Sequence, residues 1–161
     1  MTTLMFERSS AAGGVGDAGS TFDAVVRLAR HQRMDTDPVV RQQLAQLHIE
    51  SRIASLSAAR VRAALLRGDV PGPEGSIGKL ALTQVLQRTT EVVSHLLGPG
   101  LVADSGEWGT FAWAEFVTGA PGFRIGGGTD EIQRNIIGER VLGLPREPKV
   151  ADDRARSADT P

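Results

Sequence analysis

The sequence of 161 residues contains no cysteine. This absence excludes a disulfide framework and any metal site built from thiolates. Two of the three histidines, His31 and His48, lack the paired spacing that a zinc site requires. We therefore expect a protein without a structural or catalytic metal.

The chain also lacks an excess of charge of either sign, since 18 Lys and Arg residues stand against 19 Asp and Glu residues. This balance gives no electrostatic reason to expect binding to nucleic acid or to an anionic membrane surface. No long apolar run and no basic-then-apolar leader is present, so the sequence gives no sign of membrane insertion or export. We expect a cytoplasmic protein.

Strand signals are weak along the whole sequence, and no internal repeat of useful length is found. Apolar residues instead recur at helical spacing, and hydrophobic residues make up 40% of the chain. The length suits one domain with its own core. The expected fold class is all-α, in the form of an up-and-down helical bundle.

Two long stretches with apolar residues at helical spacing predict a helical hairpin. The first runs from Pro38 to about Leu66, with Asp37 as its cap and Pro38 in its first turn. Gly68 ends this helix, and a Pro-Gly-Pro segment turns the chain. The second helix is expected over residues 74–97.

Shorter elements flank the hairpin. Residues 1–12 are expected to form a short helix, which ends at a glycine-rich connection over residues 13–19. Ser20 or Thr21 then caps a helix that ends before Asp37.

An irregular stretch is expected after residues 98–100, and it contains most of the aromatic side chains. One interpretation is that they plug the core, because aromatics near helical spacing usually do so. The alternative is that they lie beside a bound acyl chain or ring. The residues concerned are Trp108, Phe111, Trp113 and Phe116.

The most informative segment covers residues 126–140. Three consecutive glycines, Gly126 to Gly128, allow left-handed backbone or close approach to a ligand. Thr129, followed by Asp130 and Glu131, is typical of the cap and acidic first turn of a helix. Such a turn serves either as an ordinary surface turn or as a ligand contact. The helix is expected to bury one apolar face made of Ile132, Ile136, Ile137 and Val141.

This segment closely resembles the C-terminal signature of the flavin-dependent acyl-CoA dehydrogenases. In that family a Gly-Thr pair opens the last helix, followed by Ile-Gln-Arg and by Gly-Glu-Arg-Val-Leu-Gly-Leu-Pro, which here spans Gly138 to Pro145. Residues 2–8 and 37–45 resemble the starts of two other helices of the same domain. The resemblance implies that residues 1–148 form the family's C-terminal helical domain. The polar residues 149–161 are expected to be a disordered tail.

Members of this family of ordinary length also have an N-terminal helical domain and a middle β-domain, neither of which this chain resembles. The resemblance implies α,β-dehydrogenation of an acyl-CoA thioester to a trans-2-enoyl-CoA. FAD is the implied cofactor, and an electron-transfer flavoprotein is the implied electron acceptor. Partner chains in a homo- or hetero-oligomer, or missing domains, are expected to complete the site.

The reaction requires a base to remove the α-proton. Many relatives place a glutamate immediately before the Gly-Thr pair, where this chain has Gly127. A second branch carries its glutamate on the first helix of this domain, directly before an arginine, and Glu7 with Arg8 matches that arrangement. The resemblance therefore implies Glu7 as the catalytic base, raised in pKa by an apolar site, and Arg8 as a substrate-binding residue. The alternative for Glu7 is a surface glutamate paired with Arg8.

The resemblance implies further residues for the cofactor. Thr129 matches a threonine that contacts the flavin, and Glu131 occupies the position of another flavin-contacting polar residue. Gly128 belongs to the same turn, and Gly98 begins a segment where relatives carry a glycine-rich flavin-contacting turn.

Two alternatives remain open from the sequence. Arg134 is either an anchor for a CoA phosphate or the partner of Glu131 or Asp130 in an ion pair within the helix. The whole chain is either part of an enzyme or a noncatalytic helical assembly module that has kept the family's oligomer interface. The missing carboxylate at Gly127 favours the second.

Overall fold

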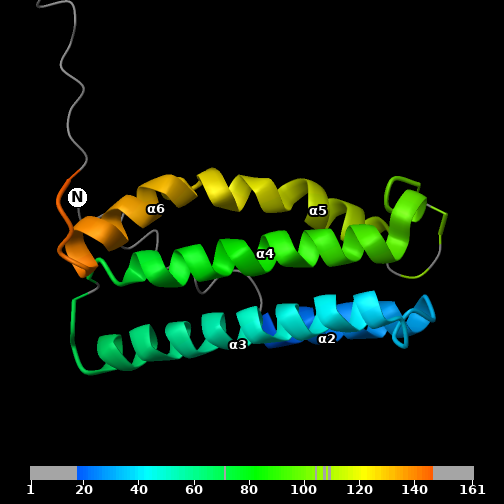
Figure 1. Ribbon diagram of the computed structural model, residues 1–161, viewed down its shortest axis with the longest axis horizontal. Coiled ribbons are helices and arrows are strands. Elements are labelled where there is room, and N and C mark those ends of the chain that lie inside the picture. Colours follow the sequence, from blue (N-terminus) through cyan, green and yellow to red (C-terminus); the bar gives the residue numbers. More distant parts are fainter. Residues whose placement is uncertain (1–17, 71, 104, 107, 109, 147–161) are drawn as a thin grey trace, which may run out of the picture.

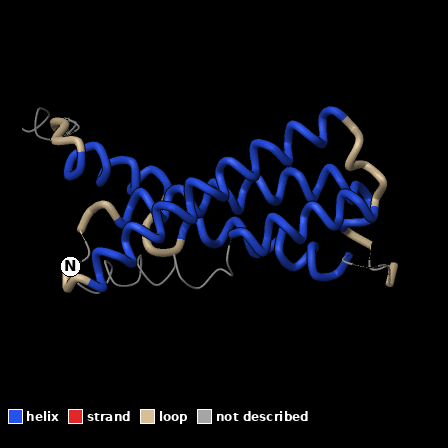
Figure 2. The backbone as a smooth tube through the Cα atoms, turned by 90° about the horizontal axis from the view of Figure 1, so that it is seen from below, coloured by secondary structure: helices blue, strands red, loops and turns tan. Residues whose placement is uncertain are grey.

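The computed structural model describes residues 18–70, 72–103, 105–106, 108 and 110–146. Every regular element in these residues is a helix, and no strand occurs among them (Figure 2). The α-helices are α2 (Ala18–His31), α3 (Pro38–Leu66), α4 (Gly75–Leu97), α5 (Thr110–Ile125) and α6 (Asp130–Ile136). A 3-10 turn, η1 (Gly98–Leu101), follows α4, and a π-helical turn, η2 (Ile137–Val141), follows α6.

Helices α2, α3, α4 and α5 run in alternating directions, and α6 continues in the direction of α5, which confirms the expected up-and-down bundle (Figure 1). Helix α4 lies at the centre and packs against α2, α3, α5 and α6. Helices α5 and α6 lie end to end along one side of α4, and α2 and α3 lie on the other (Figure 1). None of the described helices is long and apolar enough to cross a membrane.

Local signals set both ends of α3, as the sequence predicts. The Asp37 carboxylate accepts hydrogen bonds from the backbone N–H groups of Val39 and Val40, at 2.8 and 3.0 Å. These bonds satisfy two of the N–H groups that have no partner within the helix, and Pro38 in the first turn needs none. At the other end Gly68 adopts a φ of +89°, a left-handed conformation that stops the helix.

The core is built mainly from aliphatic side chains where α2, α3 and α4 meet. Val25, Leu28, Leu47, Val92 and Val93 are completely shielded from solvent. Burying one such side chain contributes about 1.5–3 kcal/mol to folding. Trp113 of α5 joins the same cluster.

The expectation of an irregular stretch around the tryptophans is wrong for residues 110–125, which form α5. Trp113, Phe116, Val117 and Ala120 recur at helical spacing and face the core. Burial of this stripe outweighs the low helix propensity of Gly119, Pro121 and Gly122, which lie on the exposed side.

The aromatic residues divide into two groups. Trp113 is buried and meets Phe116 edge-on, with 5.6 Å between ring centroids, so these two match the interpretation as a core plug. Trp108 and Phe111 are exposed, and Trp108 packs against the ring of His31. The plug interpretation is therefore wrong for Trp108 and Phe111.

Several predictions lie outside the described residues. These are the short helix over residues 1–12, most of the glycine-rich connection after it, and the tail over residues 149–161.

Candidate functional site

The glycine turn before α6 has a backbone that only glycine adopts easily. Gly127 has a φ of +66° and Gly128 a φ of +99°. A side chain at such an angle brings its Cβ close to the following carbonyl, at a cost of about 1–2 kcal/mol. A catalytic glutamate at position 127 would therefore strain this turn.

Thr129 ends the turn and caps α6, as the sequence predicts. Its hydroxyl oxygen accepts a hydrogen bond from the backbone N–H of Ile132, at 3.4 Å. The first turn of α6 then carries the carboxylates of Asp130 and Glu131. Such carboxylates favour the N-terminal end of a helix because of its dipole.

Two buried donors hold the carbonyl groups of the turn. The Gln133 side-chain amide donates to the carbonyl oxygens of Gly127 and Gly128, at 3.1 and 3.0 Å. The Lys79 ammonium of α4 also donates to the carbonyl of Gly128. Gln133 is 0% and Lys79 only 2% exposed. The turn is thus tied both to the helix that follows it and to the centre of the bundle.

Asp130 is the second connection between α6 and α4. Its buried carboxylate accepts hydrogen bonds from the Thr83 hydroxyl at 2.9 Å and from Arg124 Nε at 2.8 Å. Burial alone raises the pKa of Asp130, but the hydrogen bonds from Arg124 and Thr83, with the positive charges of Arg124 and Lys79, lower it below the ordinary value. These interactions favour the ionised form of the Asp130 carboxylate.

Glu131 points toward solvent, in contrast to Asp130. Hydrogen bonds from its own backbone N–H and from the Thr129 hydroxyl, with the nearby charge of Arg134, lower the pKa of Glu131. Arg134 lies 3.8 Å from the Glu131 carboxylate. This contact matches the interpretation of Arg134 as a partner in an ion pair within the helix.

The structure separates the residues assigned to the cofactor into two places. Gly128, Thr129 and Glu131 are adjacent at the start of α6, beside the first turns of α4. Gly98 ends α4 at its other end, with a φ of +49°. Gly98 lies 19 positions after Lys79, which corresponds to roughly 28 Å of helix. A compact group cannot contact both places in one chain (Figure 1).

Glu7 and Arg8, assigned to catalysis and to substrate binding, lie outside the described residues. Both assignments stay predictions.

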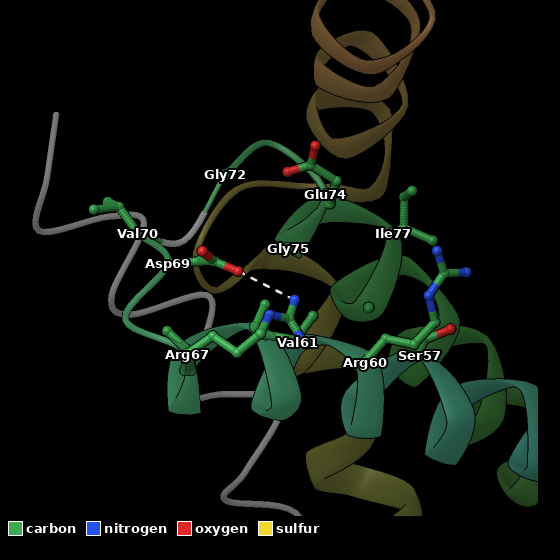
Figure 3. A pocket seen from close by; sticks show the side chains of 13 residues that line it. Ser57, Arg60, Val61, Arg67, Asp69, Val70, Gly72, Glu74, Gly75 and Ile77 are labelled. Carbon is green, nitrogen blue, oxygen red and sulfur yellow. Dashed lines mark hydrogen bonds and ion pairs between the residues drawn. The ribbon is translucent and has the colours of Figure 1, made fainter.

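One pocket of about 420 Å³ lies where α3 ends and α4 begins (Figure 3). Arg60 and Ile77 line it, and beside them Arg67 forms an ion pair with Asp69 at 3.1 Å. A second pocket, of about 290 Å³, lies between α2 and α5 against Trp113 and Phe116. The glycine turn lines neither pocket.

The prediction that α6 buries an apolar face is partly wrong. Ile132 is 46% exposed, while Asp130 and Gln133 are the buried residues of this helix. Polar side chains occupy the inner face because Thr83, Lys79 and the glycine carbonyls supply partners there.

Lys79, Thr83 and Gln133 are functional candidates that the sequence alone does not single out. One signal was available: Lys79 and Thr83 continue the helical spacing of the buried Leu86 and Val93 on α4. A lysine in line with buried residues indicates a buried partner for its charge.

Together the fold and the site define an all-helical bundle domain with a glycine turn hydrogen-bonded to one end of its central helix. Residues 1–142 match the family model described as "Acyl-CoA dehydrogenase, C-terminal domain". The chain therefore belongs to the acyl-CoA dehydrogenase family, and it corresponds to the family's C-terminal domain.

Among curated relatives, the chain is similar to acyl-CoA dehydrogenase IpdE1. It is 33% identical to the protein of Mycobacterium tuberculosis and 35% identical to that of Mycolicibacterium smegmatis, each over 157 residues and 92% of this chain. These matches cover 38% and 37% of the two relatives. The chain thus spans well under half the length of these relatives.

Solved structures show the same fold. One is a steroid acyl-CoA dehydrogenase named Tcur3481-Tcur3483, with a TM-score of 0.80, 21% identity and coverage of 91% of this chain and 39% of that one. Another is the ChsE4-ChsE5 complex from Mycobacterium tuberculosis, with a TM-score of 0.68, 22% identity and coverage of 79% and 36%.

Proposed function

We propose that this chain is the C-terminal part of a flavin-dependent acyl-CoA dehydrogenase, which converts an acyl-CoA thioester to a trans-2-enoyl-CoA. The observation that carries the proposal is the glycine turn in its family context. Gly127 and Gly128 adopt left-handed backbone, Thr129 caps the helix that follows, and the residues lie within the match to the family.

FAD is the proposed cofactor, and it supplies the acceptor for the hydride that leaves the β-carbon. We assign Gly128, Thr129 and Glu131 to contacts with it. The Glu131 side chain is exposed and its pKa is lowered by nearby hydrogen bonds, which suits a polar contact to a group outside this chain. Gly98 is at the far end of α4, so we assign it to a distant part of the cofactor or to the cofactor of a neighbouring chain.

Glu7 is the proposed base. Its carboxylate takes the α-proton of the thioester while the β-hydride departs, and the carbon–carbon double bond forms between the two positions. Arg8 is the proposed contact to the substrate. Gly127 carries no carboxylate, so the position that many relatives use for the base does not supply one here.

Partner chains complete the proposed site. The chain spans 38% of a curated relative, and the similar ChsE4-ChsE5 structure is a complex. We therefore propose an assembly with chains that supply the remaining domains, in which electrons pass to an electron-transfer flavoprotein.

The competing proposal is a noncatalytic helical assembly module, favoured by the absence of a carboxylate at Gly127. To compare the two, the tagged chain is recovered from its native cells with whatever chains accompany it. An assembly that contains FAD supports the enzyme. A colourless oligomer that takes up no added FAD supports the module.

The base is tested in the same assembly by Glu7→Gln, with the exposed Glu115→Gln as the matched control. We expect Glu7→Gln to lose turnover and keep FAD, because the amide cannot accept the α-proton. We expect Glu115→Gln to keep both. Full activity in the Glu7 variant would remove this residue from the mechanism.

A further inference from the structure

A cluster of buried polar side chains lies beneath the glycine turn. Lys79 is 2% exposed, and Thr83, Asp130 and Gln133 are also buried. Buried charges and amides are costly unless they are paired. Most of the hydrogen bonds of this cluster are accepted by the carbonyls of Gly127 and Gly128 or by the Asp130 carboxylate.

A contribution to stability alone does not explain the presence of Gln133 at this buried position. Its side-chain oxygen is buried and has no hydrogen-bond partner among the described residues. An unsatisfied buried acceptor destabilises a fold, whereas an apolar side chain of similar shape would not. The benefit of Gln133 therefore lies in its amide nitrogen, which donates to both Gly127 and Gly128.

Lys79 acts on the same turn from another helix. Its ammonium donates to Gly128, and the ionised Asp130 lies close enough for the charge of Lys79 to favour ionisation of that carboxylate. The Thr83 hydroxyl, one turn further along α4, holds Asp130 at 2.9 Å. The turn is thus fixed by donors from both α4 and α6.

We propose that Lys79 and Gln133 are positioning residues that clamp Gly127 and Gly128 in their left-handed conformation, so that the turn is preformed for the cofactor. With the carbonyls of Gly127 and Gly128 held from inside the bundle, the turn keeps one shape before a ligand arrives. A preformed contact avoids the entropy cost of ordering a glycine-rich segment at the moment of binding. The cofactor part of this proposal rests on the proposed function, whereas the clamp itself does not.

The test uses two variants with apolar side chains of similar length, Lys79→Met and Gln133→Met. Amide hydrogen exchange is followed by NMR on the chain. The reporters of the turn are the N–H groups of Gly126, bonded to Gly122, and of Ile132, bonded to Thr129. The reporters of the bundle are residues 92 and 93 in the core of α4.

For Gln133→Met we expect exchange at Gly126 and Ile132 to accelerate about tenfold, which corresponds to the loss of a typical hydrogen bond. Exchange at residues 92 and 93 and the thermal midpoint should change little, because removal of the unpaired oxygen offsets the loss of the two donated hydrogen bonds. A residue with only a structural role would accelerate exchange at the turn and in the bundle alike. Unchanged exchange at the turn, or equal acceleration throughout the bundle, would overturn the clamp.

Lys79→Met should accelerate the same two amides. If this variant does not fold, Gln133→Met decides the question. In the assembly recovered from native cells, FAD should bind the Gln133→Met protein about tenfold more weakly than the wild type. Equal FAD affinity with an accelerated turn would overturn the role in cofactor binding. An assembly whose wild type takes up no FAD would refute the proposed function, and the exchange measurements would still decide the clamp.

Discussion

Replacing Asp130 by Asn tests whether a charge, rather than a hydrogen bond alone, joins α6 to α4. Asn keeps an acceptor for the Thr83 hydroxyl and removes the negative charge opposite Arg124 and Lys79. The Arg124 side chain is 44% exposed, so its ion pair with Asp130 contributes less than about 1 kcal/mol to the free energy of unfolding. Weakening the charged hydrogen bonds of Asp130 and removing its negative charge from the vicinity of Lys79 costs about 1.5–3 kcal/mol. We expect the free energy of unfolding to fall by about 2 kcal/mol at pH 7.

The pH dependence of the stability difference between wild type and Asp130→Asn shows whether the charge of Asp130 causes it. The pKa of Asp130 in the fold lies below its ordinary value of 3.8. A lowered pKa contributes stability that is complete above the ordinary value and is lost as the pH falls through the pKa of the folded state. The variant has no such group to titrate, so the gap between wild type and variant should narrow below about pH 4.

Urea unfolding, followed by circular dichroism at pH 7 and at a series of pH values below 4, measures the gap. Asp69→Asn is the matched control, since the pair of Asp69 with Arg67 is exposed on both sides and should change stability by less than about 0.5 kcal/mol. A gap for Asp130→Asn that is as small as this control, or that does not narrow in acid, would refute the reasoning.

Three further substitutions test the fold, each by thermal or urea unfolding. Asp37→Ala removes the cap of α3 and should cost about 1 kcal/mol, and no loss would mean that the two cap hydrogen bonds do not matter. Trp113→Ala should cost about 3–5 kcal/mol because the ring is buried, whereas Phe111→Ala on the exposed face should change stability by less than about 0.5 kcal/mol. Equal effects would contradict the orientation of α5. Gly128→Ala should cost about 1–2 kcal/mol through its φ of +99°, against a negligible loss for Gly100→Ala, which has open space and no left-handed φ.

The parts of the fold that the sequence predicts well are set by local chemistry. Asp37 and Pro38 begin α3, Gly68 ends it, and Thr129 caps α6. In each case the residue acts on backbone groups within a few positions of itself, so its effect can be read without the tertiary structure.

The parts that it predicts poorly depend on contacts between distant segments. Helix α5 forms although Pro121 lies within it, because Trp113 and Ala120 face the core. The burial of Asp130 requires Thr83, 47 positions earlier, and the burial of Lys79 requires Gly128, 49 positions later. Apolar periodicity alone predicts that Ile132 is buried against the bundle. It does not predict that Asp130 and Gln133 occupy the inner face of α6 instead, because their partners lie on other segments.

The proposed activity is tested most directly by adding an acyl-CoA thioester, without oxygen, to the flavin-containing assembly recovered from native cells. We expect the flavin absorption to bleach in proportion to the substrate added, and the product to be a trans-2-enoyl-CoA. A flavin spectrum that stays unchanged across short-chain, long-chain and ring-bearing acyl-CoA thioesters, with no enoyl product, would contradict the assignment of this chain to an active dehydrogenase.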